Sequence, residues 1–148
     1  MLTRKQADAI ADRVLDWGRE NDTGRLTAAV LDAGGHPIVI KRDDGSEFLR
    51  VNIAVGKAWG ALGMGLPGRL MAERVEHFPA FFASLAAMSD GKVVPVAGGV
   101  IIRNEGVIVG ALGVSGDTSI VDEDAAVAAI EGAGLQADFG QVEEWRRP

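Results

Sequence analysis

The sequence contains two histidines and no cysteine, which limits the chemistry that its side chains can offer to a metal or substrate. Haem iron and most catalytic metals bind imidazole, so an axial ligand or a histidine base would be His36 or His77. His36 follows Asp32 and Gly35 in a glycine-rich turn and could bind a metal; the alternative is a solvated turn residue. His77 is better explained as a packed connector between helices. Because the spacing matches no zinc motif, we expect no zinc site.

Lys57 is a candidate catalytic residue because it lies within an apolar helical segment. A lysine buried there would have a lowered pKa, and it could act as a base or form a Schiff base. The alternative is that its stem packs in the core while its charge reaches Asp43 or Asp44. The sequence leaves both interpretations open.

Two polar turns form a candidate anion-binding site. Arg42 and Asp44 end the first expected hairpin, and Ser115 and Gly116 end the second. If the hairpins lie side by side, these ends would converge near the start of the second helix. The backbone amides of Gly116 and Gly99 could then bind a carboxylate or propionate, with Arg42 pairing it. The alternative is two ordinary turns with a structural arginine–aspartate pair.

Apolar periodicity and turn signals predict the elements that hold these groups. Thr3 and Gln6 form a capping box, and Ser46 is expected to cap the second helix. Predicted strands cover residues 26–31, 37–42, 100–102 and 107–114. Predicted helices run from the capping box to the glycine and polar residues of 18–24, and over about 50–62, 67–75, 79–87 and 121–132. Beyond Leu135 we expect loop and a short helical turn around Glu143 and Trp145.

This order of elements predicts an α+β fold with a mostly antiparallel sheet of two hairpins, in one domain over residues 1–148. No G-x-G-x-x-G motif opens a helix after a first strand, so a dinucleotide-binding fold is not expected. The segment from Val107 to Val114 is apolar at successive positions. Such a strand is central and covered on both faces, by helices or by another subunit, and we therefore expect a homo-oligomer.

The net charge is −6, which disfavours nucleic acid and anionic lipid as partners. The first residues carry no apolar core of a signal peptide, and no run of 18 apolar residues suggests a membrane span. A cytoplasmic protein is the expectation from these features.

Three stretches in this order resemble the GlcG/HbpS family, also called DUF336, which includes the C-terminal domain of PduO-type proteins. The stretches are Val30–His36 with Arg42–Gly45, then Ile53–Ala58, then Gly98–Gly99 followed by Val109–Gly116 and Asp122–Glu123. Ile53–Ala58 matches the family's I-A-x-x-K-A pattern, which includes Lys57. Together the stretches cover nearly the whole chain.

The resemblance implies a profilin-like fold, oligomers up to octamers, and binding of haem or a corrinoid-related ligand. Arg50 stands where the family often has Ser, and Ile101 where its GG-x-P pattern has Pro. Some haem-binding members use an axial histidine near the first helix, and this chain has none there.

Our first hypothesis is a binding protein for haem, another tetrapyrrole-like molecule or an acidic metabolite. A second hypothesis is a small enzyme, an isomerase, lyase or hydrolase of an organic acid, with Lys57 as base or electrophile and Arg42 as carboxylate anchor. A third is a structural unit of an assembly. The expected ligand-binding residues are Asp32, Gly35, His36, Arg42, Asp44, Gly99, Ser115 and Gly116, with His36 also the candidate metal ligand.

Overall fold

The computed structural model describes residues 1–141, and the structural statements below concern that part of the chain. Its elements are α1 (Arg4–Glu20), β1 (Thr27–Asp32), β2 (Pro37–Arg42), α2 (Leu49–Met64), α3 (Gly68–His77), α4 (Pro79–Met88), β3 (Gly99–Asn104), β4 (Val107–Ser115), α5 (Ser119–Gly132) and β5 (Gln136–Asp138). One five-stranded antiparallel sheet has the order β2-β1-β4-β3-β5. This architecture confirms the predicted α+β class.

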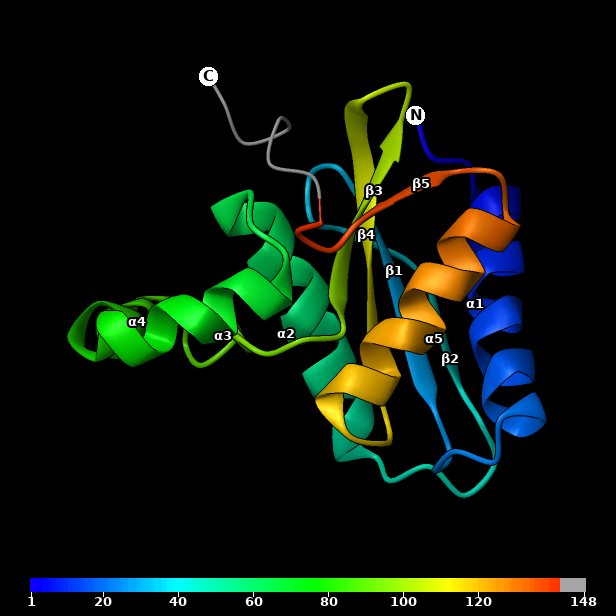
Figure 1. The fold of residues 1–148 in the computed structure, drawn as a ribbon, viewed down its shortest axis with the longest axis horizontal. Helices are drawn as coiled ribbons and strands as arrows, with labels where there is room; N and C mark the ends of the chain where they lie inside the picture. Colours follow the sequence, from blue (N-terminus) through cyan, green and yellow to red (C-terminus); the bar gives the residue numbers. More distant parts are fainter. Residues whose placement is uncertain (142–148) are drawn as a thin grey trace.

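The sheet is covered on both faces. Helices α1 and α5 lie on one face and α2 on the other, while α3 and α4 extend away from the sheet beyond α2 (Figure 1). Strand β4 is central, and its last six residues are buried, as its two-sided apolar pattern predicts. No helix within residues 1–141 combines the length and the apolar character needed to cross a bilayer.

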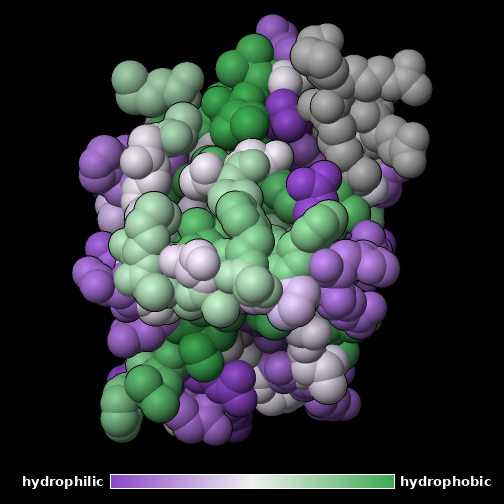
Figure 2. Space-filling view, turned by 90° about the vertical axis from the view of Figure 1, so that its left-hand side faces the viewer, coloured by the Kyte–Doolittle hydropathy of each residue, from purple (hydrophilic) through white to green (hydrophobic). Residues whose placement is uncertain are grey.

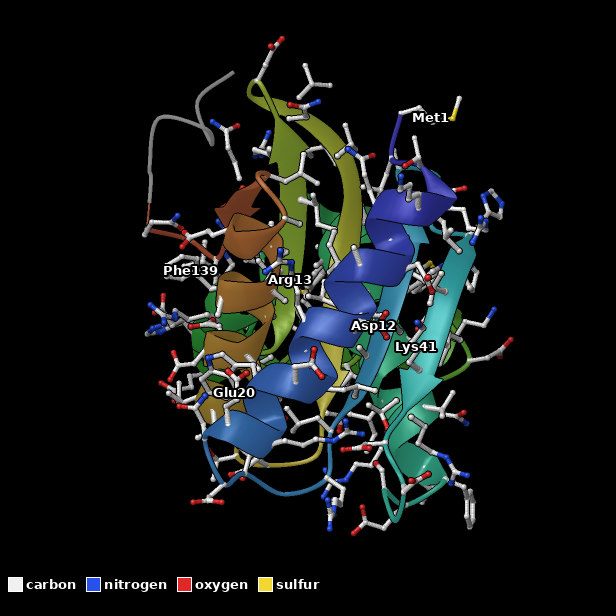
Figure 3. The ribbon with its side chains drawn as sticks, turned by 90° about the vertical axis from the view of Figure 1, so that its right-hand side faces the viewer. Met1, Asp12, Arg13, Glu20, Lys41 and Phe139 are labelled. Atoms are coloured by element: carbon white, nitrogen blue, oxygen red, sulfur yellow. The ribbon has the colours of Figure 1, made fainter. Side chains whose placement is uncertain are left out.

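Helix α1 packs through the apolar stripe that its sequence predicts. Ala7, Ile10, Ala11 and Val14 are fully buried, and the Thr3–Gln6 capping box is present. Its outer side carries charge: Lys41 of β2 places its Nζ 2.8 Å from Asp12 Oδ1, and these two side chains point toward one another in Figure 3. The helix is therefore held to the sheet by its buried apolar side chains and by the ion pair between Asp12 and Lys41 at the edge of the sheet.

The structure differs from the predicted elements in several places, including a longer β3 and later ends of α2 and α3. Ser46 does not cap α2, because its hydroxyl shares a hydrogen bond with the buried Thr27 hydroxyl at 2.9 Å. Helix α5 begins two residues earlier than predicted and is capped by Thr118. Strand β5 was missed, because its three residues are too few for an alternating pattern. The helical turn expected around Glu143 and Trp145 lies outside the described residues.

Helix α2 lies unusually close to the sheet because two glycines face it. Gly99 of β3 and Gly113 of β4 are cross-strand partners. A Cβ atom at Gly113 would overlap the carbonyl of Ala54, and one at Gly99 would overlap the carbonyl of Lys57. The two strands thus offer a patch without side chains on which the α2 backbone rests.

Glycines within α2 allow a second close contact, between this helix and the segment that follows α4. A Cβ at Gly56 would meet the carbonyl of Lys92 and the side chain of Val94, and one at Gly60 would lie 3.1 Å from Val93. The segment after α4 therefore runs directly against α2. A Cβ at Gly63 would meet nothing within 4 Å, so Gly63 makes no such close approach.

We predict that Gly113→Ala lowers the free energy of unfolding by about 3 kcal/mol, since α2 must shift to admit the methyl group. The matched control is Gly63→Ala in the same helix, which should stabilise the protein by about 0.5–1 kcal/mol through helix propensity. Urea unfolding followed by circular dichroism measures both. Equal stability of the two variants would show that the close contact is unimportant.

The loop between β2 and α2 is held by Asp43, whose side chain is 6% exposed. Its Oδ1 accepts hydrogen bonds from Arg19 Nη2 at 2.7 Å and from the Asp44 amide at 2.9 Å. The Arg19 guanidinium, which donates the first of these bonds, holds the pKa of the Asp43 carboxyl below its usual value of 3.8. This loop therefore depends on an ionised Asp43.

We predict that stability contributed by Asp43 is present above pH 3.8 and is lost as the pH falls through the lowered pKa of the folded state. The variant Asp43→Asn should be less stable than the wild type near neutral pH. The difference between the two should shrink as the solution is acidified. Thermal unfolding from pH 7 to pH 2.5 measures this, and a pH-independent difference would contradict the assignment.

Candidate functional site

Lys57 lies in the core, with its side chain only 3% exposed. Its Nζ donates to the Val114 carbonyl at 2.9 Å and to Asp122 Oδ2 at 3.0 Å, and Asp122 Oδ1 accepts from the Asp117 amide at 2.9 Å. The ion pair joins α2 on one face of the sheet to α5 on the other. The expected partners of Lys57, Asp43 and Asp44, are not the ones it contacts.

Burial has the largest effect on the pKa values of Lys57 and Asp122. It lowers the pKa of the Lys57 ammonium and raises the pKa of the Asp122 carboxyl, and the attraction between the two groups opposes both shifts. A lowered pKa is what a lysine base requires. The Nζ atom is nevertheless surrounded by protein acceptors and by Gly98, at which a Cβ would lie 2.9 Å away.

A second buried acid lies next to the first on α5. Glu123 is 1% exposed and forms an ion pair with Arg69 of α3, whose guanidinium also lies 5.2 Å from the centre of the Phe139 ring. Burial raises the pKa of Glu123, and Arg69 opposes that shift. The two adjacent acids therefore tie α5 to α2 and to α3.

The ends of the two hairpins do lie side by side, because Thr27 pairs with Arg42 on one side and with Ser115 on the other. The side chains there already have protein partners. Arg42 Nη1 donates to the Ser46 carbonyl at 3.0 Å, and Arg50 Nη1 donates to Ser115 Oγ at 3.3 Å.

The glycines at this end of the sheet face protein atoms. A Cβ at Gly116 would overlap the carbonyl of Arg25, and Gly99 packs on α2 as described above. Asp44 is exposed. These residues thus form a closely packed end of the sheet, with Arg42 and Asp44 at its surface.

Asp32, Gly35 and His36 lie at the opposite end of the sheet. Strand β1 separates the two groups by about 17 Å, at roughly 3.4 Å per residue over its length. Asp32 Oδ1 accepts from the amides of Gly34 and His36 at 2.9 and 3.0 Å, and it lies 3.3 Å from His36 Nδ1. These amides, that of His36 foremost, lower the pKa of Asp32.

The contact with Asp32 also orients the His36 imidazole. When Nδ1 carries the proton toward the carboxylate, Nε2 presents its lone pair outward, which is the arrangement of many metal-bound histidines. The side chain of His36 is 81% exposed. Within residues 1–141, no group of three or more acidic or histidine side chains is placed to hold a metal ion.

A groove of about 410 Å³ runs beside this turn. It is lined by Gly35 and Pro37 of the hairpin, by Asn52, Val55, Gly56 and Trp59 of α2, and by the Asp90–Lys92 turn that follows α4. A smaller hollow of about 200 Å³ adjoins it and shares Gly35 and Trp59. Trp59 therefore stands between two openings.

Helix geometry explains how α2 serves both the core and the groove. Asn52, Val55, Gly56 and Trp59 recur at three- and four-residue spacing and share the outward side of the helix. Ala54, Ala58 and Ala61 are fully buried on the side that faces the sheet. The Lys92 ammonium lies 5.6 Å from the centre of the Trp59 ring, within cation–π range.

A separate hollow of about 310 Å³ lies far from this groove, at the end of α1. It is lined mainly by polar residues that include Arg19, Arg25 and Asp43. Arg19 and Asp43 already bind each other there. The groove at Trp59 offers more apolar surface together with a few polar groups, which is the usual composition of a small-molecule site. We therefore take it as the candidate functional site.

The geometry defines an α+β protein with an apolar groove between a hairpin turn and a helix. A family model described as "Haem degrading protein HbpS-like" matches residues 2–131, and the chain belongs to this HbpS-like family. A corrinoid adenosyltransferase PduO from Citrobacter freundii is 31% identical over 105 residues, and that from Salmonella typhimurium is 30% identical. The match covers 71% of this chain but only 31% of either relative.

Solved structures share the fold. The crystal structure of a PduOC–haem complex matches with a TM-score of 0.83 and 23% identity, covering 93% of this chain and 98% of that one. The protein ORFY of Klebsiella pneumoniae, assigned to DUF336, matches at 0.81 and 23% identity over 89% and 90% of the two chains. HbpS matches at 0.77 and 24% identity over 88% and 89%.

Sequence reasoning missed Trp59, Asn52 and Lys92, and it left Asp122 and Glu123 without partners. The first two could have been found from their spacing with Val55, which places them on one side of the expected helix. Lys92 gave no such signal, because its position depends on the path of the chain after α4.

We predict that Lys57→Met lowers the free energy of unfolding by about 3–5 kcal/mol, because Asp122 is left buried without a counter-charge. The double variant Lys57→Met, Asp122→Asn should recover most of this loss, since the amide keeps an acceptor for Asp117 but carries no charge. Denaturant unfolding at pH 7 compares the three proteins. Wild-type stability of the single variant would contradict a structural role for the pair.

Proposed function

We propose that this chain is a binding protein for a planar, acidic small molecule of the tetrapyrrole class, and that the ligand lies against Trp59 in the groove. The observation that carries this proposal is the position of Trp59 between two hollows, beside the Asp32–His36 turn and below the Lys92 ammonium. The family and the likeness to a PduOC–haem complex support the same class of ligand.

Each residue of the groove has a role that follows from its chemistry. The indole of Trp59 offers a flat apolar face for a ring system. Lys92 offers a positive charge to a carboxylate or propionate, and Asn52 can donate and accept hydrogen bonds. Gly35 carries no side chain that would fill the groove, and Gly56 lets the chain at Lys92 approach α2 closely.

The residues of this region fit haem in three respects. Gly35 and Pro37, the chain neighbours of His36, line the groove; the His36 Nδ1 contacts the Asp32 carboxylate, which orients the ring; and Lys92 brings an ammonium group to the groove for a propionate. Haem, when bound, would supply an iron centre that can bind further ligands. The protein would hold the macrocycle through Trp59, ligate the iron through His36 and exclude water from one face of the ring.

The alternative, an isomerase, lyase or hydrolase acting on an organic acid, would use Lys57 and Arg42. Lys57 has the lowered pKa that such a base needs. However, it lines neither the groove nor its neighbouring hollow, and its Nζ already binds Val114 and Asp122. We therefore propose binding rather than catalysis as the function. We also propose that the chain acts as a homo-oligomer, because large apolar side chains remain exposed on it.

Absorbance titrations with haemin and with metal-free protoporphyrin IX test the site. We predict that Trp59→Ala weakens binding of both by about tenfold or more, because both rings lose the stacking face. His36→Ala should abolish the shifted Soret band of haemin and leave protoporphyrin IX binding unchanged. His77→Ala is the matched control and should behave as the wild type with both ligands.

The outcomes separate the parts of the proposal. Tight haemin binding that survives Trp59→Ala would place the ligand elsewhere on the protein. Loss of the shifted Soret band in His77→Ala, but not in His36→Ala, would identify His77 rather than His36 as the iron ligand. Weak, nonsaturating binding of both porphyrins to the wild type would overturn the tetrapyrrole assignment.

A further inference from the structure

Lys92 lies over the indole of Trp59 and has no carboxylate partner within residues 1–141. Its Nζ is 5.6 Å from the centre of the indole ring, whereas Lys41 and Lys57 each form ion pairs with acids. A cation–π contact at an exposed site is weaker than a charge-assisted hydrogen bond to a carboxylate. The ammonium of Lys92 is therefore available to an anion that enters the groove.

The backbone of Lys92 is fixed, and only its side chain is free to move. Its amide donates to the Ser89 carbonyl at 3.2 Å, and a Cβ at Gly56 would overlap the Lys92 carbonyl. The Val94 amide also donates to the Gly56 carbonyl at 3.3 Å. The chain is thus held against α2 one turn before Trp59, while the Lys92 side chain is exposed.

The indole is held by its edges and leaves its faces to the two hollows. A Cβ at Gly35 would lie 3.3 Å from Trp59 Cδ1, and the ring packs against the edge of the core. Lys92 lines the larger groove and not the smaller hollow. A flat ligand that approaches the indole from the groove therefore meets the Lys92 ammonium first.

We propose that Lys92 determines which ligands the groove accepts, by covering the indole when the groove is empty and moving onto a carboxylate of the ligand when it is filled. This selectivity rests on the binding function proposed above. A neutral ring displaces the ammonium from the indole and offers nothing in return. A ring with a carboxylate replaces the cation–π contact by a charge-assisted hydrogen bond, so the groove takes anionic rings in preference to neutral rings of the same size.

The charges around the groove make Lys92 the source of such a preference. Asp90 lines the groove and Asp32 lies in the adjoining turn, and both acids repel an anion, as does the net charge of −6. Helix α4, which precedes this turn, carries no charge from Pro79 to Met88. Figure 2 shows the side from which α3 and α4 extend, with largely apolar or neutral residues across its centre.

Two ligands of the same ring and size test the preference: protoporphyrin IX, and its derivative in which both propionates are primary amides. Absorbance titration of the wild type should give at least about tenfold tighter binding of the acid than of the amide. In Lys92→Met the acid should lose about tenfold, while the amide should bind as before or up to about threefold more tightly, because the indole is no longer covered. A merely structural role of Lys92 would weaken both ligands alike.

Two matched variants in the same turn serve as controls. Lys92→Arg should keep the preference for the acid, because a guanidinium both stacks on aromatic rings and pairs with carboxylates. Asp90→Asn removes the opposite charge two residues away, at a backbone φ of 54° that asparagine tolerates. It should strengthen binding of the acid by at most about threefold and keep the preference.

Proton NMR of the ligand-free protein tests the resting position of Lys92. Its ε-methylene protons should resonate upfield of those of the exposed Lys5, because the ring current of the indole shields them, and Trp59→Leu should remove the difference. Unshifted signals in the wild type would overturn the covering of the indole.

The binding outcomes separate this inference from the function on which it rests. Equal affinity of the wild type for acid and amide, with binding of both still lost in Trp59→Ala, would overturn the role of Lys92 and leave the binding function intact. Equal weakening of both ligands in Lys92→Met would do the same. Absence of saturable binding of either porphyrin to the wild type would overturn both.

Discussion

The rest of the structure depends on the close contact between the α2 backbone and the glycine pair Gly99 and Gly113. Side chains at these two positions would hold the helix away from the sheet. With the helix in direct contact, the short side chains of Ala54, Ala58 and Ala61 are fully buried in the interface. The low aromatic content of the chain is compatible with a dense core for this reason, since backbone rather than large side chains occupies the space.

The contact also decides the surroundings of Lys57. Its carbonyl rests on Gly99, so its side chain leaves the helix at the depth of the sheet and passes Gly98 to reach Val114 and Asp122. A charge in such a place costs desolvation free energy that only a partner can offset. The ion pair thus fixes the position of α5 relative to α2 on opposite faces of one sheet. Arg69 and Glu123 repeat the arrangement with α3.

The groove is formed on the other side of the same helix. Because α2 is anchored by one side, its outer side can present Asn52, Val55 and Trp59 to the groove, and Trp59 also packs against the edge of the core. The β1–β2 hairpin adds Gly35 and Pro37, and the chain returning from α4 adds Lys92. A rigid helix thus provides the flat apolar face, while two turns provide the polar groups, which suits a ligand with an apolar ring and charged edges.

The sequence by itself determined the order of the elements, the two hairpins and the antiparallel α+β class. These follow from local periodicity, from the Thr3–Gln6 capping box and from the positive φ angles of turn glycines such as Gly35. It also singled out Lys57, and it placed Arg42 and Ser115 at hairpin ends that would converge if the hairpins lay side by side; the pairing of β1 with β4 that brings these ends together came from the structure. Ser46 shows the limit of local signals: a good capping residue binds Thr27 instead.

Only the tertiary structure decided which groups meet. Lys57 and Asp122 are 65 residues apart, and the contact between them requires α2 and α5 to lie on opposite faces of the same sheet end. The separation of His36 from Arg42 comes from the length of β1, and the meeting of Trp59 with Lys92 comes from the path of the chain after α4. Such contacts are set by packing between distant segments, and local sequence patterns carry no information about them.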